Sequence, residues 1–199
     1  YQQSVKNGEW QKADDFCLIN QPIRELSAMT IGIIGYGELG KNVALMAKFF
    51  GMKVLINTRS KSNLEKDDAI SPLNTLLKEA DIISLHCPLT NETKNMISDI
   101  ELSLMKNNAI LINTARGALV DSQALLEALV SKKIAGAAID VLPQEPPIDG
   151  NCLLDYHDNN LILTPHIAWA TSKARQNAID QLAKTICAFQ AGQKLNVIS

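Results

Sequence analysis

Short apolar runs alternate with longer amphipathic stretches along the chain from Thr30 onward. Most of the runs are continuously apolar, which is typical of parallel strands covered by helices on both faces. Strands are predicted over residues 31–34, 53–56, 81–85, 109–113, 135–141 and 161–164. Strands that alternate with helices in this way predict an α/β fold with a doubly wound parallel sheet.

The segments between the runs carry helix signals. An apolar stripe at helical spacing follows the first run and predicts a helix that ends before Gly51; its members are Leu39, Val43, Ala47 and Phe50. Asp121 supplies a side-chain cap for a later helix. Thr171 begins a long final helix that runs to about residue 189 and closes at Gly192.

The alternation also divides the chain into three parts. Residues 1–28 do not follow it and are interpreted as a connecting arm. The α/β domain is expected over residues 29–170, and a final helix and tail over residues 171–199.

The composition argues against several classes of partner. The 199 residues carry 19 Lys and Arg against 21 Asp and Glu, and they contain no basic cluster of the kind that nucleic acids or anionic membranes require. The apolar runs are shorter than the roughly 20 residues of a membrane-spanning helix. The amino end has no signal-peptide pattern, and the four cysteines have no metal-ligand spacing and are interpreted as reduced thiols. We therefore expect a cytoplasmic protein with neither nucleic-acid nor membrane partners.

Residues 35–40 are Gly-Tyr-Gly-Glu-Leu-Gly, a G-x-G-x-x-G motif between a predicted strand and a predicted helix. The first glycine permits a tight turn, the second lets the backbone approach a pyrophosphate, and the third allows close packing of helix on strand. The amino end of the helix adds free N–H donors and a favourable dipole. The motif predicts a Rossmann-type dinucleotide-binding domain with contacts from Gly35, Gly37, Glu38, Leu39 and Gly40.

The second predicted strand leads into Thr58, Arg59 and Ser60, where an acidic residue usually binds the adenosine ribose. A guanidinium beside two hydroxyls suits a 2′-phosphate, because a carboxylate there would repel it. The sequence therefore favours NADP(H) as the cofactor. The alternative is NAD(H), bound through the backbone and Thr58 while Arg59 stays a solvated cation.

Three polar segments follow later strands: Asn-Thr-Ala-Arg-Gly at 113–117, Asp-Val-Leu-Pro-Gln-Glu-Pro at 140–146 and Thr-Pro-His-Ile-Ala-Trp at 164–169. With the glycine motif and His-Cys-Pro-Leu-Thr at 86–90, they resemble the D-isomer-specific 2-hydroxyacid dehydrogenase family. The resemblance covers Thr30 to about residue 196. The arm, with Gly-Glu-Trp at 8–10, is most similar to the glycerate dehydrogenase and hydroxypyruvate reductase branch.

The resemblance implies reversible hydride transfer between a nicotinamide cofactor and a small 2-hydroxy or 2-oxo acid, with glycerate, hydroxypyruvate or glyoxylate favoured. It implies that Arg116 pairs with the substrate carboxylate and 2-oxo oxygen, that His166 is the general acid and base, and that Glu145 bonds the far imidazole nitrogen. Further cofactor contacts are implied for Cys87, Pro88, Thr93, Thr114, Ala115, Asp140 and Ala168.

The residue types suit this chemistry. Reduction of a ketone develops an alkoxide, so a proton donor must lie within about 2.6–3.2 Å of that oxygen. Histidine donates and accepts protons near neutral pH, a carboxylate behind it fixes its tautomer, and an arginine binds an anionic substrate. His86 is the competing imidazole and is assigned to packing or to shaping the cofactor loop. Arg116, Glu145 or His166 alone would more often have a structural role. The prediction rests on their occurring together, after successive strands and in the order of the family.

Members of the family carry a further substrate domain upstream, of roughly 100 residues, which closes over the substrate; this sequence lacks it. We therefore expect the 199 residues alone to fold and bind the dinucleotide but to turn over substrate slowly or not at all. A homodimer through the cofactor domains is expected. The alternative function is a non-catalytic dinucleotide-sensing module of the corepressor type, because that group shares the arginine, glutamate and histidine.

Overall fold

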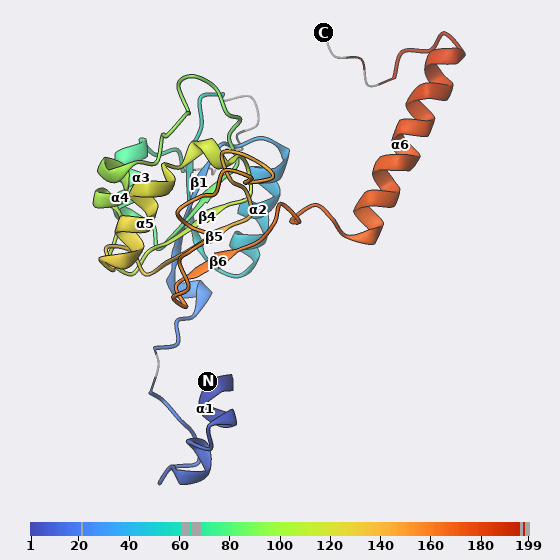
Figure 1. The fold of residues 1–199 in the computed structure, drawn as a ribbon. Coiled ribbons are helices and arrows are strands. Elements are labelled where there is room, and N and C mark those ends of the chain that lie inside the picture. Colours follow the sequence, from blue (N-terminus) through green and yellow to red (C-terminus); the bar gives the residue numbers. More distant parts are fainter. Residues whose placement is uncertain (21, 61–63, 65–68, 196, 198–199) are drawn as a thin grey trace.

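The computed structural model describes residues 1–20, 22–60, 64, 69–195 and 197. Its centre is a six-stranded sheet in the order β2-β1-β3-β4-β5-β6, with every neighbouring pair parallel (Figure 1). The doubly wound parallel sheet expected from the sequence is confirmed, and each strand end lies within two residues of its prediction. The strands are β1 (Thr30–Ile34), β2 (Lys53–Asn57), β3 (Ile82–Leu85), β4 (Ile110–Asn113), β5 (Gly136–Ile139) and β6 (Leu161–Leu163).

Helices cover both faces of the sheet (Figure 1). One face carries α2 over β1 and β2, and the opposite face carries α3, α4 and α5. The larger apolar core lies between the sheet and these three helices and includes Ile83 and Leu111, while a smaller core under α2 includes Ile33 and Ala44. The helix bounds are α2 (Glu38–Phe49), α3 (Leu73–Glu79), α4 (Asp99–Leu104) and α5 (Ser122–Val130).

The apolar stripe predicted for α2 is wrong at both ends. Leu39 and Phe50 are 72% and 58% exposed, whereas the helix buries Gly40, Ala44 and Ala47. Small residues form the buried face because α2 begins so close to the glycine turn that a Cβ on Gly40 would clash with backbone. Where a helix packs this closely, the buried face carries small residues, so a pattern of large apolar residues predicts the wrong face.

The predicted cap at Asp121 and the predicted helix start at Thr171 are confirmed. The Asp121 carboxylate accepts hydrogen bonds from two backbone N–H groups at the start of α5, and the Thr171 hydroxyl accepts one at the start of α6 (Ser172–Gln190). The sequence analysis does not predict α4, although Ser98 and Glu101 form a capping box at its start. That helix is six residues long, too short for an apolar period to be visible.

Both ends of the chain extend away from the sheet (Figure 1). The amino-terminal arm contains α1 (Gln2–Lys6) and 3₁₀ turns at Trp10–Lys12 and Leu26–Ala28, none of which has a buried residue. Helix α6 also buries none of its residues. Residues 196, 198 and 199 of the predicted tail lie outside the described residues. Among the described helices, none is long and apolar enough to cross a membrane.

Asp81 connects separate segments where strands β1 and β3 begin. Its Oδ2 accepts a hydrogen bond from the Thr30 N–H and its Oδ1 accepts one from the Lys106 ammonium, each at 2.9 Å. Burial opposes the charge, but these bonds outweigh it and hold the pKa of Asp81 below its ordinary value of 3.8. A carboxylate with a lowered pKa stabilises the fold above its unfolded pKa, and this contribution is lost as the pH falls through the folded value.

We expect Asp81→Asn to lower the free energy of unfolding by about 1–3 kcal/mol near neutral pH, because hydrogen bonds to a charged group are lost. The difference from wild type should shrink below pH 3.8, where the wild-type carboxyl also takes up a proton. Urea unfolding at several pH values measures it. Glu79→Gln is the control, because its pair with Lys53 is exposed and should contribute far less. Equal losses in both variants would contradict this account.

Candidate functional site

The glycine turn between β1 and α2 leaves room for a ligand at one position only. Gly35 has φ +92°, and a Cβ there would lie 2.5 Å from the Cys87 nitrogen. A Cβ on Gly40 would lie 2.1 Å from the Gly35 carbonyl oxygen, whereas a Cβ on Gly37 would meet nothing within 4 Å. No side chain caps the first N–H groups of α2. Open space beside free N–H donors at a helix start fits a pyrophosphate group.

The end of β2 lies beside this turn. The Gly35 N–H donates to the Asn57 carbonyl oxygen at 2.8 Å, so Thr58, Arg59 and Ser60 begin next to the glycines. The Thr58 hydroxyl donates to the Ser60 carbonyl oxygen at 3.1 Å. The side chain of Arg59 is exposed to solvent.

Arg59 has an acidic neighbour on the loop that follows β3. A hydrogen bond from the Thr90 hydroxyl, together with the nearby positive charge of Arg59, holds the pKa of Glu92 below its ordinary value. The Arg59 guanidinium is open to solvent, where an anion can approach it.

The loop after β3 holds Cys87, Pro88 and Thr93. Cys87 is half-buried against the glycine turn, and burial raises the pKa of its thiol. The Thr93 hydroxyl accepts from the Thr90 N–H at 2.7 Å and donates to the Pro88 carbonyl oxygen at 2.8 Å, so it is used within its own loop. Its proposed contact with a cofactor stays a prediction.

His86 turns back toward the sheet. Its Nε2 lies 2.8 Å from the Ser84 hydroxyl, and burial lowers the pKa of the imidazole. The imidazole of His86 therefore bonds a side chain of its own strand, β3.

The loop after β4 is organised by Asn113, a residue that the sequence analysis does not single out. Asn113 is fully buried; its amide nitrogen donates to the Arg116 carbonyl oxygen at 2.9 Å, and its amide oxygen accepts from the Ala115 N–H at 3.1 Å. These bonds shape the turn that contains Thr114, Ala115 and Arg116. A polar residue ending an otherwise apolar strand is the signal that could have identified it.

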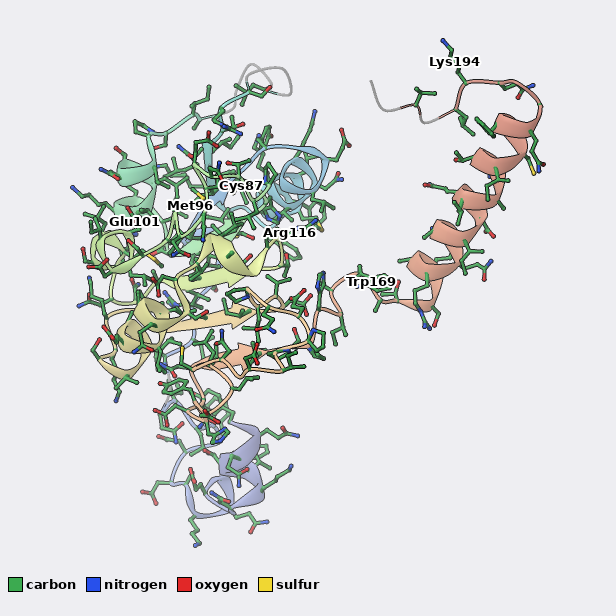
Figure 2. All side chains as sticks on the ribbon, turned by 45° about the horizontal axis from the view of Figure 1, so that its top comes forward. Cys87, Met96, Glu101, Arg116, Trp169 and Lys194 are labelled. Carbon is green, nitrogen blue, oxygen red and sulfur yellow. The ribbon has the colours of Figure 1, made fainter. Side chains whose placement is uncertain are left out.

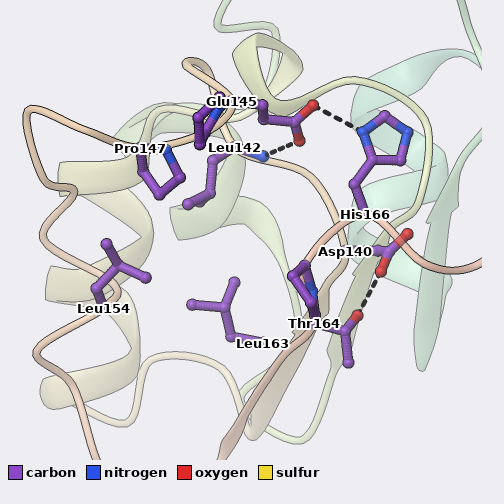
Figure 3. A pocket seen from close by; sticks show the side chains of 10 residues that line it. Asp140, Leu142, Glu145, Pro147, Leu154, Leu163, Thr164 and His166 are labelled. Atoms are coloured by element: carbon purple, nitrogen blue, oxygen red, sulfur yellow. Dashed lines mark hydrogen bonds and ion pairs between the residues drawn. The ribbon is translucent and has the colours of Figure 1, made fainter.

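The loop after β5 meets the loop after β4. A Cβ on Gly117 would lie 2.0 Å from the Leu142 carbonyl carbon, so only glycine permits this approach. The Leu142 N–H donates to Glu145 Oε1 at 2.9 Å, and Glu145 Oε2 lies 2.7 Å from His166 Nδ1 (Figure 3). Nε2 of the same ring remains available to a substrate.

Asp140, at the end of β5, is 5% exposed and ties down the turn after β6. Its carboxylate accepts from the Thr164 hydroxyl and from the N–H groups of Ile167 and Ala168. Burial would raise the pKa of Asp140, but these hydrogen bonds outweigh it and hold the pKa below the ordinary value. All of these donors to the Asp140 carboxylate are groups of the protein itself. The predicted contacts of Asp140 and Ala168 with a cofactor stay predictions.

Arg116, Glu145 and His166 line one cavity of about 250 Å³, together with Leu89 and Gly117. A second cavity of about 560 Å³ touches the glutamate and histidine and is otherwise mostly apolar (Figure 3). In Figure 2, Cys87 and Arg116 both lie on the body that contains the sheet, whereas Trp169 lies on the segment leading out to α6. The structure thus brings the three candidate groups for proton transfer and anion binding together. No cluster of metal ligands occurs among the described residues.

Comparison with known proteins agrees with this arrangement. The family described as "D-isomer specific 2-hydroxyacid dehydrogenase, NAD binding domain" matches residues 1–168. The chain belongs to this family. It is similar to the glycerate dehydrogenase of Methylorubrum extorquens, with 49% identity over 198 residues, covering 100% of this chain and 62% of that protein. The expected resemblance to the glycerate dehydrogenase branch is confirmed.

Solved structures of relatives share the fold. D-lactate dehydrogenase with NAD⁺ from Lactobacillus jensenii is 36% identical with a TM-score of 0.81, over 98% of this chain and 64% of that one. The acyclic imino acid reductase Bsp5, in complex with NADPH and D-Arg, is 35% identical with a TM-score of 0.80, over 99% and 62%. The chain therefore spans less than two thirds of the length of these relatives.

The glycine turn yields a matched pair of variants. Gly40→Ala should lower the thermal unfolding midpoint and weaken dinucleotide binding, because its Cβ meets the Gly35 carbonyl oxygen. Gly37→Ala should leave the midpoint nearly unchanged but weaken NADH and NADPH binding by about tenfold or more, because its methyl group occupies the space that a pyrophosphate needs. Calorimetry and fluorescence titration measure the two effects. Undiminished binding by Gly37→Ala would place the dinucleotide elsewhere.

Proposed function

We propose that this chain is the cofactor-binding part of an NAD(P)-dependent dehydrogenase that acts on small 2-hydroxy and 2-oxo acids, with glycerate and hydroxypyruvate favoured. The observation that carries the proposal is the convergence of Arg116, Glu145 and His166 on one cavity. The similarity to glycerate dehydrogenase supports the substrate class.

When bound, a nicotinamide cofactor would supply the hydride chemistry of the proposed reaction. The Arg116 guanidinium binds the carboxylate of the acid and the 2-oxo oxygen, where negative charge grows during reduction. His166 Nε2 donates the proton to that oxygen, and it takes the proton back in the reverse direction. Glu145 accepts a hydrogen bond from Nδ1 and so fixes the tautomer and orientation of the ring.

Residues outside this chain complete the site in the proposed reaction. The cavity beside Arg116 has a volume of about 250 Å³, and this chain spans 62% of the glycerate dehydrogenase that it resembles. A second domain that closes over the substrate would exclude water and add donors to its carboxylate. We therefore propose that the 199 residues alone bind dinucleotide but reduce hydroxypyruvate slowly or not at all.

The test uses the full-length protein. Hydroxypyruvate and glyoxylate should be reduced, and His166→Gln should lower kcat by about 10²- to 10⁴-fold, because the proton donor is lost. His157→Gln is the control, since His157 is exposed in the loop before β6. Full activity of His166→Gln would overturn the proposal. Intact dinucleotide binding without any turnover by the wild type would favour the dinucleotide-sensing alternative.

We also propose that the cofactor is NADP(H). Support comes from the position of Arg59, with the hydroxyl residues Thr58 and Ser60 beside it, next to the glycine turn. A guanidinium there binds a 2′-phosphate through parallel hydrogen bonds.

Arg59→Ala should raise the KM for NADPH by about tenfold or more and change the KM for NADH by less than about twofold. Lys78→Ala removes an equal charge from the exposed side of α3 and should leave both constants unchanged. Steady-state kinetics with both cofactors measure the change. A wild-type protein that prefers NADH would overturn the assignment to NADP(H).

We further propose a homodimer. Helix α2 exposes large apolar side chains to solvent, with Met46 58%, Phe49 88% and Phe50 58% exposed, and the two phenylalanine rings contact each other edge to face. Light scattering of the complete protein should give twice the mass of one chain, and Phe49→Glu should lower it toward the monomer mass. A monomeric wild type would contradict this proposal.

A further inference from the structure

The turn that carries His166 is built around Asp140. Strands β5 and β6 run parallel side by side, so Asp140 and Thr164, which directly follow them, lie next to each other (Figure 3). The main-chain oxygen of Asp140 accepts from the His166 N–H at 2.7 Å. Its carboxylate accepts from the N–H groups of Ile167 and Ala168, each at 2.9 Å. The Thr164 hydroxyl supplies one more donor, to Oδ1.

His166 needs this support because its backbone is unusual. Its φ is +55°, in the left-handed region that residues with a Cβ rarely adopt. Such a conformation persists only where surrounding contacts over-determine it. The imidazole contributes little packing, since 43% of the side chain is exposed and its ring bonds only to Glu145 among the described residues. Main-chain contacts therefore hold this residue. Its N–H donates to the main-chain oxygens of Asp140 and Thr164, its carbonyl oxygen accepts from the Trp169 indole N–H at 2.9 Å, and the two N–H groups that follow it bond the Asp140 carboxylate.

We propose that Thr164 is a positioning residue, whose hydroxyl locks the Asp140 carboxylate in the orientation that holds His166 toward Glu145. This inference rests on the proposed function, in which His166 transfers the proton. Thr164 and Asp140 line the cavity of about 560 Å³, whereas Thr164 does not line the cavity of about 250 Å³ that contains Arg116. The hydroxyl of Thr164 bonds Asp140, and through it the turn of His166.

The hydroxyl, and not merely the shape of the side chain, is the essential feature. Without it, Oδ1 of a nearly buried carboxylate keeps only the Ile167 N–H as a donor. A buried charge that loses a donor turns toward solvent or another partner, because an unsatisfied charged group is costly. Either movement releases the N–H groups of Ile167 and Ala168 and frees the left-handed residue before them.

Thr164→Val and Thr164→Ser form a matched pair, since valine preserves the branched shape without the hydroxyl and serine preserves the hydroxyl. In the complete protein, Thr164→Val should lower kcat for hydroxypyruvate by about tenfold or more, with the KM values for acid and cofactor within about twofold of wild type. Thr164→Ser should stay within about twofold in every constant. Thr75→Val, the same change on the exposed side of α3, should have no effect.

A second readout needs no activity. Amide hydrogen exchange at Ile167 and Ala168 should become about tenfold faster in Thr164→Val and stay near wild type in Thr164→Ser, while amides in β3 remain unchanged. The ¹⁵N chemical shift of His166 Nδ1, which reports its bond to Glu145, should change only in Thr164→Val. The chain has three histidines, so this signal is assigned by comparison with His86 and His157 variants.

The outcomes separate this inference from the proposed function. Unchanged kcat and unchanged exchange in Thr164→Val would overturn it, as would equal losses in the valine and serine variants. A rise in the cofactor KM at constant kcat would instead make Thr164 a binding residue and also overturn it. If the wild type shows no turnover, the proposed function fails, and the exchange rates and the Nδ1 shift still decide whether Thr164 holds the turn.

Discussion

The parallel pairing of the six strands is the constraint on which the site depends. Since every strand runs in the same direction, every carboxyl end lies at one edge of the sheet, and the loops that follow meet there. Gly35 and His166 are separated by more than a hundred residues in sequence, yet each belongs to a loop at that edge. A strand inserted in the opposite direction would carry its loop to the far edge and remove its residues from the site.

At this edge of the sheet, the main chains of neighbouring loops lie very close to each other. The turn at Gly35 lies against the loop after β3, and Gly117 lies against Leu142, at distances that no Cβ would allow. These approaches bring the arginine loop and the glutamate loop into contact. Buried polar residues at strand ends then fix the shape of the loops: Asn113 does so after β4, and Asp140 does so after β5 and β6. Buried polar residues at the strand ends thus hold the backbone of Arg116 and of His166.

The proposed function requires more than the groups that this chain places at the sheet edge. The chain carries the glycine turn and the groups proposed for proton transfer and anion binding, and its two ends extend from the sheet without burying a residue in α1 or α6. The relatives have additional length, and apolar side chains on α2 are exposed. In the proposed function, the dinucleotide binds at the sheet edge, and a further surface excludes water from the reacting atoms.

The sequence by itself determined the order and direction of the elements, because apolar runs, caps and glycine spacing are local patterns that survive without knowledge of the fold. It also proposed Arg116, Glu145 and His166 as candidates, through the resemblance of motifs that follow successive strands, and the three line one cavity. It did not reveal the capping box of α4, the buried face of α2, or the roles of Asn113 and Thr164. Those depend on which atoms come within hydrogen-bond distance or packing distance across neighbouring strands. The tertiary structure alone decided them, since a hydroxyl or an amide has the same sequence signature whether it meets solvent or a buried carboxylate.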